Sequence, residues 1–199
     1  MTYEGSKVDA ANRSDLEAIA TLIPHKARVL DLGCGDGILL TSLIERKQII
    51  ARGVEIDEIN VRACITRGLS VRHGNIEEGL ADYRDDAFDY VTLSKTLAYL
   101  DHPEPVVREM LRVGKFAVIS FENSGYWRYR WRSLLGQGAG YDLCSGEPRM
   151  RAITLHQFSD FCVCTDSNIN RVIYLTGTRT ISRLPSLRAA DAVYVLSRK

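Results

Sequence analysis

Long apolar runs, strong net charge and disulfide-type cysteine spacing are all missing from this chain of 199 residues. No stretch approaches the roughly 18–20 apolar residues that span a bilayer, and residues 1–15 lack the apolar centre of a signal peptide. The net charge of +1 gives no overall attraction to nucleic acid or to anionic membranes. Five cysteines, an odd number without framework spacing, indicate a reducing compartment. We therefore expect a cytoplasmic protein without a membrane partner.

Metal-ligand spacing is also missing, because no His/Cys cluster has the pattern of a zinc site. We expect no metal, and we expect the cysteines to act as small core residues. The composition is otherwise that of an ordinary globular protein, with 45% apolar and 26% charged residues. The length suits one domain over residues 1–199, with an N-terminal helix region at 1–25 and a lid or insert at 124–152.

Apolar periodicity predicts an alternation of strands and helices. An amphipathic helix is expected around Leu16, Ile19, Ala20 and Ile23. Strands are expected at 28–32, 51–56, 69–73, 88–93, 115–121, 170–176 and 191–198, and later helices at 37–47, 58–67, 103–113 and 154–164. The alternation predicts an α/β, Rossmann-like fold with a mostly parallel, doubly wound sheet of seven strands and helices on both faces.

The run from Val29 to Gly37 predicts a strand followed by a glycine-rich turn and a helix. Glycines at alternate positions let the backbone come close to a ligand, and the N–H groups at the start of the helix face that ligand. A dinucleotide fingerprint needs its third glycine at position 38, where this chain has isoleucine. The pattern D-x-G-x-G-x-G instead resembles motif I of class I S-adenosylmethionine (SAM)-dependent methyltransferases. An ordinary βα turn is the alternative. The turn residues expected to bind the cofactor are Asp31, Gly33, Cys34, Gly35 and Gly37.

Acidic residues around the turn favour SAM, or S-adenosylhomocysteine, because SAM carries an ammonium and a sulfonium rather than a pyrophosphate. Glu55 ends the second predicted strand, where a carboxylate accepts from ribose hydroxyls. The resemblance implies that Ile56 packs on the adenine. Asp57 can either contact the ligand or cap the next helix.

Two more sites follow from the same resemblance. Many class I enzymes place an aspartate after the third strand to bind the adenine amino group, and here Asn75, followed by Ile76, stands in that place. An asparagine oxygen can still accept that hydrogen bond. Ser94 ends the fourth predicted strand beside the expected methyl-donor face.

The segment 125–132 interleaves four aromatic residues with three arginines. Such a segment can stack on nucleic acid, anchor a protein interface, or form a lid helix with its aromatic side chains turned inward. The neutral overall charge argues against nucleic acid. The other two interpretations stay open.

Several stretches together resemble the MetW family of bacterial methionine-biosynthesis proteins. They are 29–37, 53–57, 78–80, 88–91, 94–97, 108–114 and 120–128, with a late helix at 155–162. Glu122 departs from the family, which has proline there. The resemblance implies a class I methyltransferase fold closed by an antiparallel strand pair. It also implies a partner, the homoserine O-acyltransferase MetX, docking through 125–132. A homodimer is a further option for assembly.

Catalysis is undecided at this level. The sequence Ser94–Leu97 lacks the Asn/Asp-Pro-Pro-aromatic signature of nucleobase methylation, and no general base stands out near it. We consider two hypotheses, a SAM-binding partner or regulator of the acyltransferase and a small-molecule methyltransferase. An RNA-binding methyltransferase is a third and weaker reading. The catalytic residues are unknown.

Overall fold

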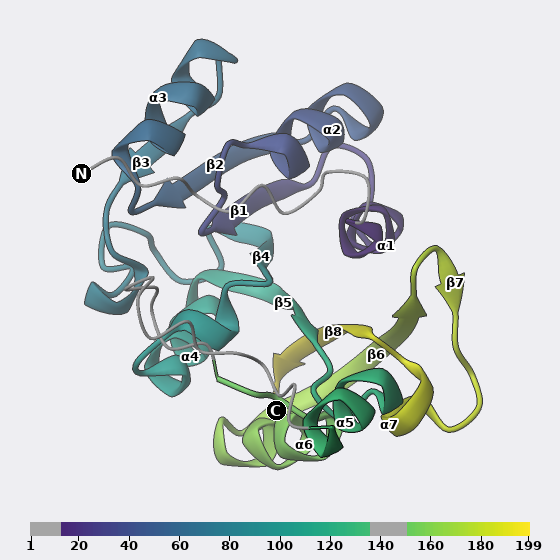
Figure 1. The fold of residues 1–199 in the computed structure, drawn as a ribbon. Helices are drawn as coiled ribbons and strands as arrows, with labels where there is room; N and C mark the ends of the chain where they lie inside the picture. The colour runs from purple at the N-terminus through teal and green to yellow at the C-terminus, as the bar shows by residue number, and fades with distance from the viewer. Residues whose placement is uncertain (1–12, 136–150) are drawn as a thin grey trace.

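The structure is a computed structural model, and it describes residues 13–135 and 151–199. In this part of the chain eight strands form one sheet in the order β3-β2-β1-β4-β5-β8-β6-β7 (Figure 1). The strands are β1 Arg28–Leu32, β2 Ile50–Glu55, β3 Val71–His73, β4 Phe88–Ser94, β5 Gly114–Glu122, β6 Ser167–Thr176, β7 Arg179–Thr180 and β8 Asp191–Arg198. The first five run parallel, whereas β8 pairs antiparallel with β5 and β6.

Local capping explains where several helices begin. Asp57 accepts from two backbone N–H groups at the start of α3, which confirms its capping role. Thr154 and Gln157 form a capping box before α6, and Pro103 opens α4. The helices are α1 Ser14–Leu22, α2 Ile38–Lys47, α3 Glu58–Thr66, α4 Pro103–Val113, α5 Trp127–Leu134, α6 Leu155–Cys164 and α7 Pro185–Arg188, with 3-10 turns at Ile76–Glu78 and Leu97–Tyr99.

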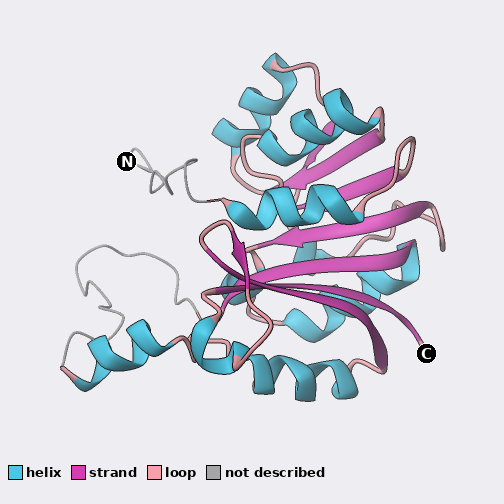
Figure 2. Cartoon of the chain, turned by 90° about the vertical axis from the view of Figure 1, so that its right-hand side faces the viewer, coloured by secondary structure: helices cyan, strands magenta, loops and turns pink. Residues whose placement is uncertain are grey.

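Helices cover both faces of the sheet (Figure 2). Val29 packs with α1 and α2 on one face, and its neighbour Leu30 packs with α4 on the other. Adjacent strand residues point to opposite faces, so a parallel strand covered on both sides is apolar throughout. The chain order reverses between β1 and β4, where the ends of both strands leave a crevice. That crevice positions the site described below.

The structure departs from the sequence expectations in several places, among them the helix α7 and the starts of β3 and β6. The sheet has an eighth strand, β7, which pairs with β6 across a two-residue turn containing Gly177. Two residues are too few to show a strand period. The irregular region 124–152 begins with the helix α5, and its residues 136–150 lie outside the described part. Among the described cysteines, Cys164 is exposed rather than in the core.

Candidate functional site

The turn between β1 and α2 brings backbone and neighbouring side chains together. Gly33, Gly35 and Gly37 have φ of 67°, 55° and 81°, a region that favours glycine. A Cβ on Gly33 would lie 2.7 Å from the Thr96 Oγ1, and one on Gly37 would lie 2.3 Å from a Leu69 methyl. A Cβ on Gly35 would meet nothing within 4 Å. Gly33 and Gly37 therefore serve packing, whereas Gly35 leaves open space for a ligand.

Glu55, the last residue of β2, is fixed beside this open space. Its Oε2 accepts from the Gly35 N–H at 2.7 Å, and its Oε1 accepts from the N–H groups of Ile56 and Asp57, both at 2.9 Å. Three backbone donors thus hold the buried carboxylate in one orientation. Each carboxylate oxygen has two lone pairs, so the group can still accept from a ligand hydroxyl.

Asp31 and Cys34 are covered by protein. The Oδ1 of Asp31 accepts from the Thr92 hydroxyl at 2.5 Å. Burial raises the pKa of Asp31 to about 7, although Thr92 and the charge of Arg13 act in the opposite direction. The Cys34 thiol packs against Gly53, and burial raises its pKa. Cys34 therefore offers its backbone to the turn, and Asp31 is only 2% exposed, so its side chain presents almost no surface for direct contact.

The side of the site expected to hold adenine is partly apolar. Ile56 is 63% exposed and presents a surface that a flat ring can cover. The Asn75 Oδ1 accepts from the Glu77 N–H at 2.9 Å, which caps the 3-10 turn and leaves one lone pair. Ile76 is buried in the core, so only its backbone is available.

A buried carboxylate that sequence reasoning missed joins α1 to the sheet. Asp15 is fully buried, and its Oδ2 accepts from the hydroxyls of Ser94 at 2.8 Å and Ser120 at 3.0 Å. Arg13 lies 3.0 Å from its Oδ1 and also donates to Ser94. Burial raises the pKa of Asp15, but Arg13 and Ser94 outweigh burial, and the pKa falls below its ordinary value. One signal was available, since Asp15 stands four residues before Ile19 on the apolar face of the predicted helix.

A second group of charged side chains, Lys95, Glu122 and Asp191, lies at the ends of β4, β5 and β8. The Lys95 Nζ is 3.2 Å from the Glu122 Oε1 and 3.1 Å from the Asp191 Oδ1. Burial by itself lowers the pKa of Lys95. Asp191 and the other acids outweigh burial, so the pKa lies above its ordinary value. Lys95 has a φ of 55°, which costs a non-glycine residue about 1–2 kcal/mol. Such strain clusters at functional sites.

The helix α5 follows a buried anchor. The side chain of Asn123 donates to the carbonyl of Ala189 at 2.8 Å and accepts from the Gly125 N–H. The lid interpretation is right that 127–132 is helical; of the four aromatic side chains Tyr126 is buried, whereas the other three line the cleft and stay partly exposed. Trp127, Tyr129 and Trp131 are 53%, 41% and 60% exposed. In the described part of the chain this helix lies at a rim, not on a core.

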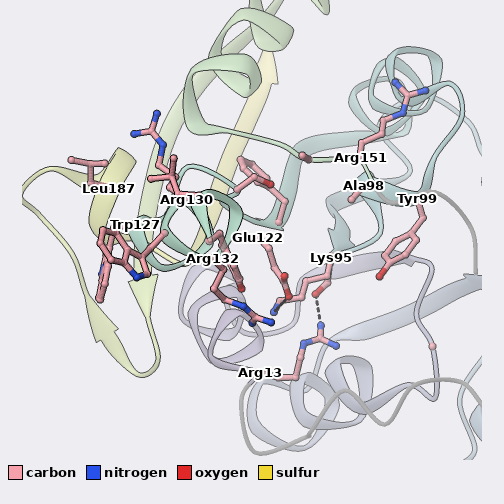
Figure 3. Close-up of a pocket in the computed structure, with 18 of the residues that line it drawn as sticks. Arg13, Lys95, Ala98, Tyr99, Glu122, Trp127, Arg130, Arg132, Arg151 and Leu187 are labelled. Atoms are coloured by element: carbon pink, nitrogen blue, oxygen red, sulfur yellow. Dashed lines mark hydrogen bonds and ion pairs between the residues drawn. The ribbon is translucent and has the colours of Figure 1, made fainter. Parts of the chain in front are cut away.

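A cleft of about 1230 Å³ is lined by some of these groups, whereas Glu55, Ile56 and Asn75 are not among its lining residues. Figure 3 shows its lining from Arg13 and Lys95 across Glu122 to Trp127 and Arg132 of α5. Gly35, Asn60 and Ser94 also line it. The open side of the glycine turn and the face of α5 therefore border one space.

Within 13–135 and 151–199, no three His, Cys, Asp or Glu side chains gather as metal ligands would. The helices of the same ranges include none that is long and apolar enough to cross a membrane.

The strand order and the glycine turn define a class I SAM-dependent methyltransferase fold. A SAM-dependent methyltransferase of Thermotoga maritima, described as a possible histamine N-methyltransferase, superposes with a TM-score of 0.71 at 19% identity, covering 95% of this chain and 89% of that one. A SAM-dependent methyltransferase of Mesorhizobium loti gives 0.70 at 16%, covering 96% and 99%. At these identities the likeness concerns the fold alone.

The chain belongs to the MetW family, since the sequence profile of "Methionine biosynthesis protein MetW" matches residues 13–196. It is 36% identical over 137 residues to the bifunctional methionine biosynthesis protein MetXA/MetW of Rhodopirellula baltica, covering 65% of this chain and 22% of that protein. It is 34% identical over 99 residues to a ubiquinone biosynthesis O-methyltransferase of Hahella chejuensis, covering 47% and 40%. The chain thus spans less than half the length of either relative.

Proposed function

We propose that this MetW-type protein binds SAM or S-adenosylhomocysteine at the glycine turn and acts as a partner or regulator of a homoserine O-acyltransferase. The observation that carries the partnership is the Rhodopirellula baltica relative, whose name joins a MetXA and a MetW activity in one chain. The ligand is supported by the fixed Glu55 carboxylate beside the open face of Gly35.

Particular residues would hold each part of the ligand. Glu55 would accept from the ribose hydroxyls, and Ile56 and Asn75 would contact the adenine. Arg13, which lines the cleft with Gly35, would face the carboxylate of the amino-acid end. When bound, SAM supplies a methyl group made electrophilic by the positive sulfur. The acids around the turn suit its two positive charges.

The partnership is tested by co-purification of the acyltransferase with the tagged protein from native lysate, with and without SAM. The variants Trp127→Ala and Arg128→Ala change two exposed residues of α5, and aromatic residues and arginine dominate protein interfaces. We expect either variant to lose the complex. The controls Ile50→Ala and Arg62→Ala change exposed residues of β2 and α3 and should keep it. Absence of a complex under every ligand condition would reject the partnership.

A small-molecule methyltransferase is the second candidate. It is favoured by the Lys95–Glu122–Asp191 group, which places ionisable side chains beside the cleft where the sequence offered no general base. The test is turnover of SAM to S-adenosylhomocysteine in the presence of cell extract. We expect Gly35→Val to abolish turnover, since its side chain would fill the open space beside the turn. If no extract fraction supports turnover, the methyltransferase hypothesis is rejected and only the ligand-binding role remains.

A further inference from the structure

Two stretches of the chain carry positive charge only. Residues 123–135, which include α5, and residues 167–190, which include β6, β7 and α7, contain seven arginines and no Asp, Glu or Lys. Without these seven arginines the chain's net charge of +1 would be −6. The near-neutral total therefore conceals an uneven distribution of charge. A local patch of one sign attracts partners of the opposite sign.

The two stretches lie side by side in the fold. The side chain of Asn123 donates to the Ser186 carbonyl at 3.2 Å, and a Cβ on Gly125 would lie 3.0 Å from the same oxygen. The helix α5 begins two residues after Gly125, so it lies beside α7 (Figure 1). The end of α7 is held to the end of β6, because the Ala190 N–H donates to the Leu175 carbonyl at 2.8 Å. The β6–β7 hairpin, α7 and α5 therefore form one continuous region.

Five exposed arginines of this region form what we call the arginine surface: Arg128 and Arg130 of α5, Arg179 of β7, and Arg183 and Arg188 at the two ends of α7. None of them forms an ion pair with a described residue. By contrast, Arg62 and Arg108 each pair with an acid one helical turn away. In Figure 3, Arg130 points away from Arg13 and Lys95, whereas Arg132 points towards them. Arg132 is therefore not part of this surface.

The residues around the arginine surface indicate which kind of partner it fits. Trp127, Leu184 and Leu187 are exposed, and Trp127 and Leu187 line the same cleft. Protein interfaces are enriched in aromatic residues and arginine and depleted in lysine and acids. Surfaces for nucleic acid or anionic membrane use lysine as readily as arginine. The composition therefore favours a protein partner, and the charge requires acidic residues on it.

We propose that the arginine surface docks on an acidic face of the homoserine O-acyltransferase, so that the contact extends from α5 over α7 to the β6–β7 hairpin. This inference rests on the proposed function, which places the acyltransferase at α5. It adds the chemistry of the partner's face and two further elements of contact. Arginine pairs with carboxylates through two parallel hydrogen bonds, and Trp127 and Leu187 would be covered in the same contact.

The rate of association measures this attraction directly. Purified acyltransferase is passed over the immobilised protein between about 0.05 and 0.5 M NaCl, a range over which salt increasingly screens charges. We expect the association rate to fall about tenfold or more over this range, because salt removes electrostatic steering. The triple variant Arg179→Glu, Arg183→Glu and Arg188→Glu leaves α5 unchanged. It should associate about tenfold more slowly at low salt and lose most of the salt dependence.

A matched control has the same change in net charge at another place. Arg52→Glu, Arg62→Glu and Arg84→Glu change exposed residues of β2, of α3 and of the loop before β4. This control should slow association by about threefold or less, since steering depends on where the charges lie. Urea denaturation shows whether each variant is folded. If the reversed triple variant is not folded, the same three positions of the arginine surface changed from Arg to Gln take its place.

Each outcome decides the proposal. A salt-sensitive complex that the triple variant weakens and the control does not supports it. A complex that forms equally at every salt concentration, or that both variants weaken alike, overturns it. In that case loss of the complex in Trp127→Ala still supports the proposed function. Tighter binding of duplex DNA or of phosphatidylglycerol vesicles than of the acyltransferase, at the same salt concentration, also overturns it. No complex at any salt concentration rejects the proposed partnership and this inference together.

Discussion

Removal of the Glu55 carboxylate is the sharpest test of the cofactor site. The side chain accepts three backbone hydrogen bonds, from Gly35 at 2.7 Å and from Ile56 and Asp57 at 2.9 Å. Glu55→Ala leaves these three backbone donors without their carboxylate partner. Hydrogen bonds to charged groups contribute roughly 1.5–3 kcal/mol each, and water replaces part of that loss here. We expect a loss of about 1.5–3 kcal/mol in the free energy of unfolding.

The loss of binding is calculated separately. If Glu55 accepts from the ribose, the affinity for S-adenosylhomocysteine should fall by roughly 1.5–3 kcal/mol, or about tenfold to a hundredfold. Calorimetry gives the affinity, and urea denaturation shows that the variant is folded under the same conditions. Glu58→Ala is the control, because Glu58 is exposed and its one ion pair with a described residue is with Arg62. It should change stability by less than about 1 kcal/mol and leave the affinity unchanged.

A ligand change completes the test. An S-adenosylhomocysteine analogue without the ribose 2′-hydroxyl should bind the unchanged protein more weakly, and Glu55→Ala should add little to that loss. Such non-additivity is the signature of a direct contact. A folded Glu55→Ala variant that binds S-adenosylhomocysteine as well as the unchanged protein would refute the assignment.

Three further predictions concern stability, measured by urea denaturation. The folded-state pKa of Asp31 (about 7) lies above its ordinary value of 3.8. Ionisation of Asp31 therefore lowers the free energy of unfolding as pH rises from about 4 to about 7. Asp31→Asn should gain stability relative to the unchanged protein across that window, and a difference independent of pH would contradict this. Asp15→Ala leaves the Arg13 charge without its partner and should cost about 3 kcal/mol, whereas Glu17→Ala, which removes an exposed pair, should cost less than about 1 kcal/mol. Gly37→Ala should be more destabilising than Gly35→Ala. The positive φ costs either variant about 1–2 kcal/mol, and only a Cβ at position 37 also meets Leu69. Equal losses would show that Leu69 moves aside.

Much of the fold was predictable because its signals are local. The predicted bounds of β1, β4 and β8 lie within one residue of the observed bounds at each end, and the predicted and observed bounds of α4 are identical. Asp57 was a candidate cap, and it caps α3. Elements too short for a period, such as β7, left no comparable signal.

What the side chains of α5 face was not predictable from the sequence. A helix that interleaves aromatic residues with arginines can pack equally well on a core, a partner or a ligand. Burial depends on what lies opposite, and in the described structure Trp127 and Trp131 face the cleft. The pattern therefore identified the segment but not its surroundings.

By itself, the sequence determined the glycine turn and the position of Glu55 at the end of the next strand, because both depend on neighbours along the chain. The tertiary structure alone decided which charges meet at the site. Asp15 reaches Ser94 and Ser120 only because α1 packs across the ends of β4 and β5. Asp191 reaches Lys95 only because β8 inserts antiparallel beside β5, opposite Glu122. Contacts between residues tens of positions apart follow from strand order, which no local pattern encodes.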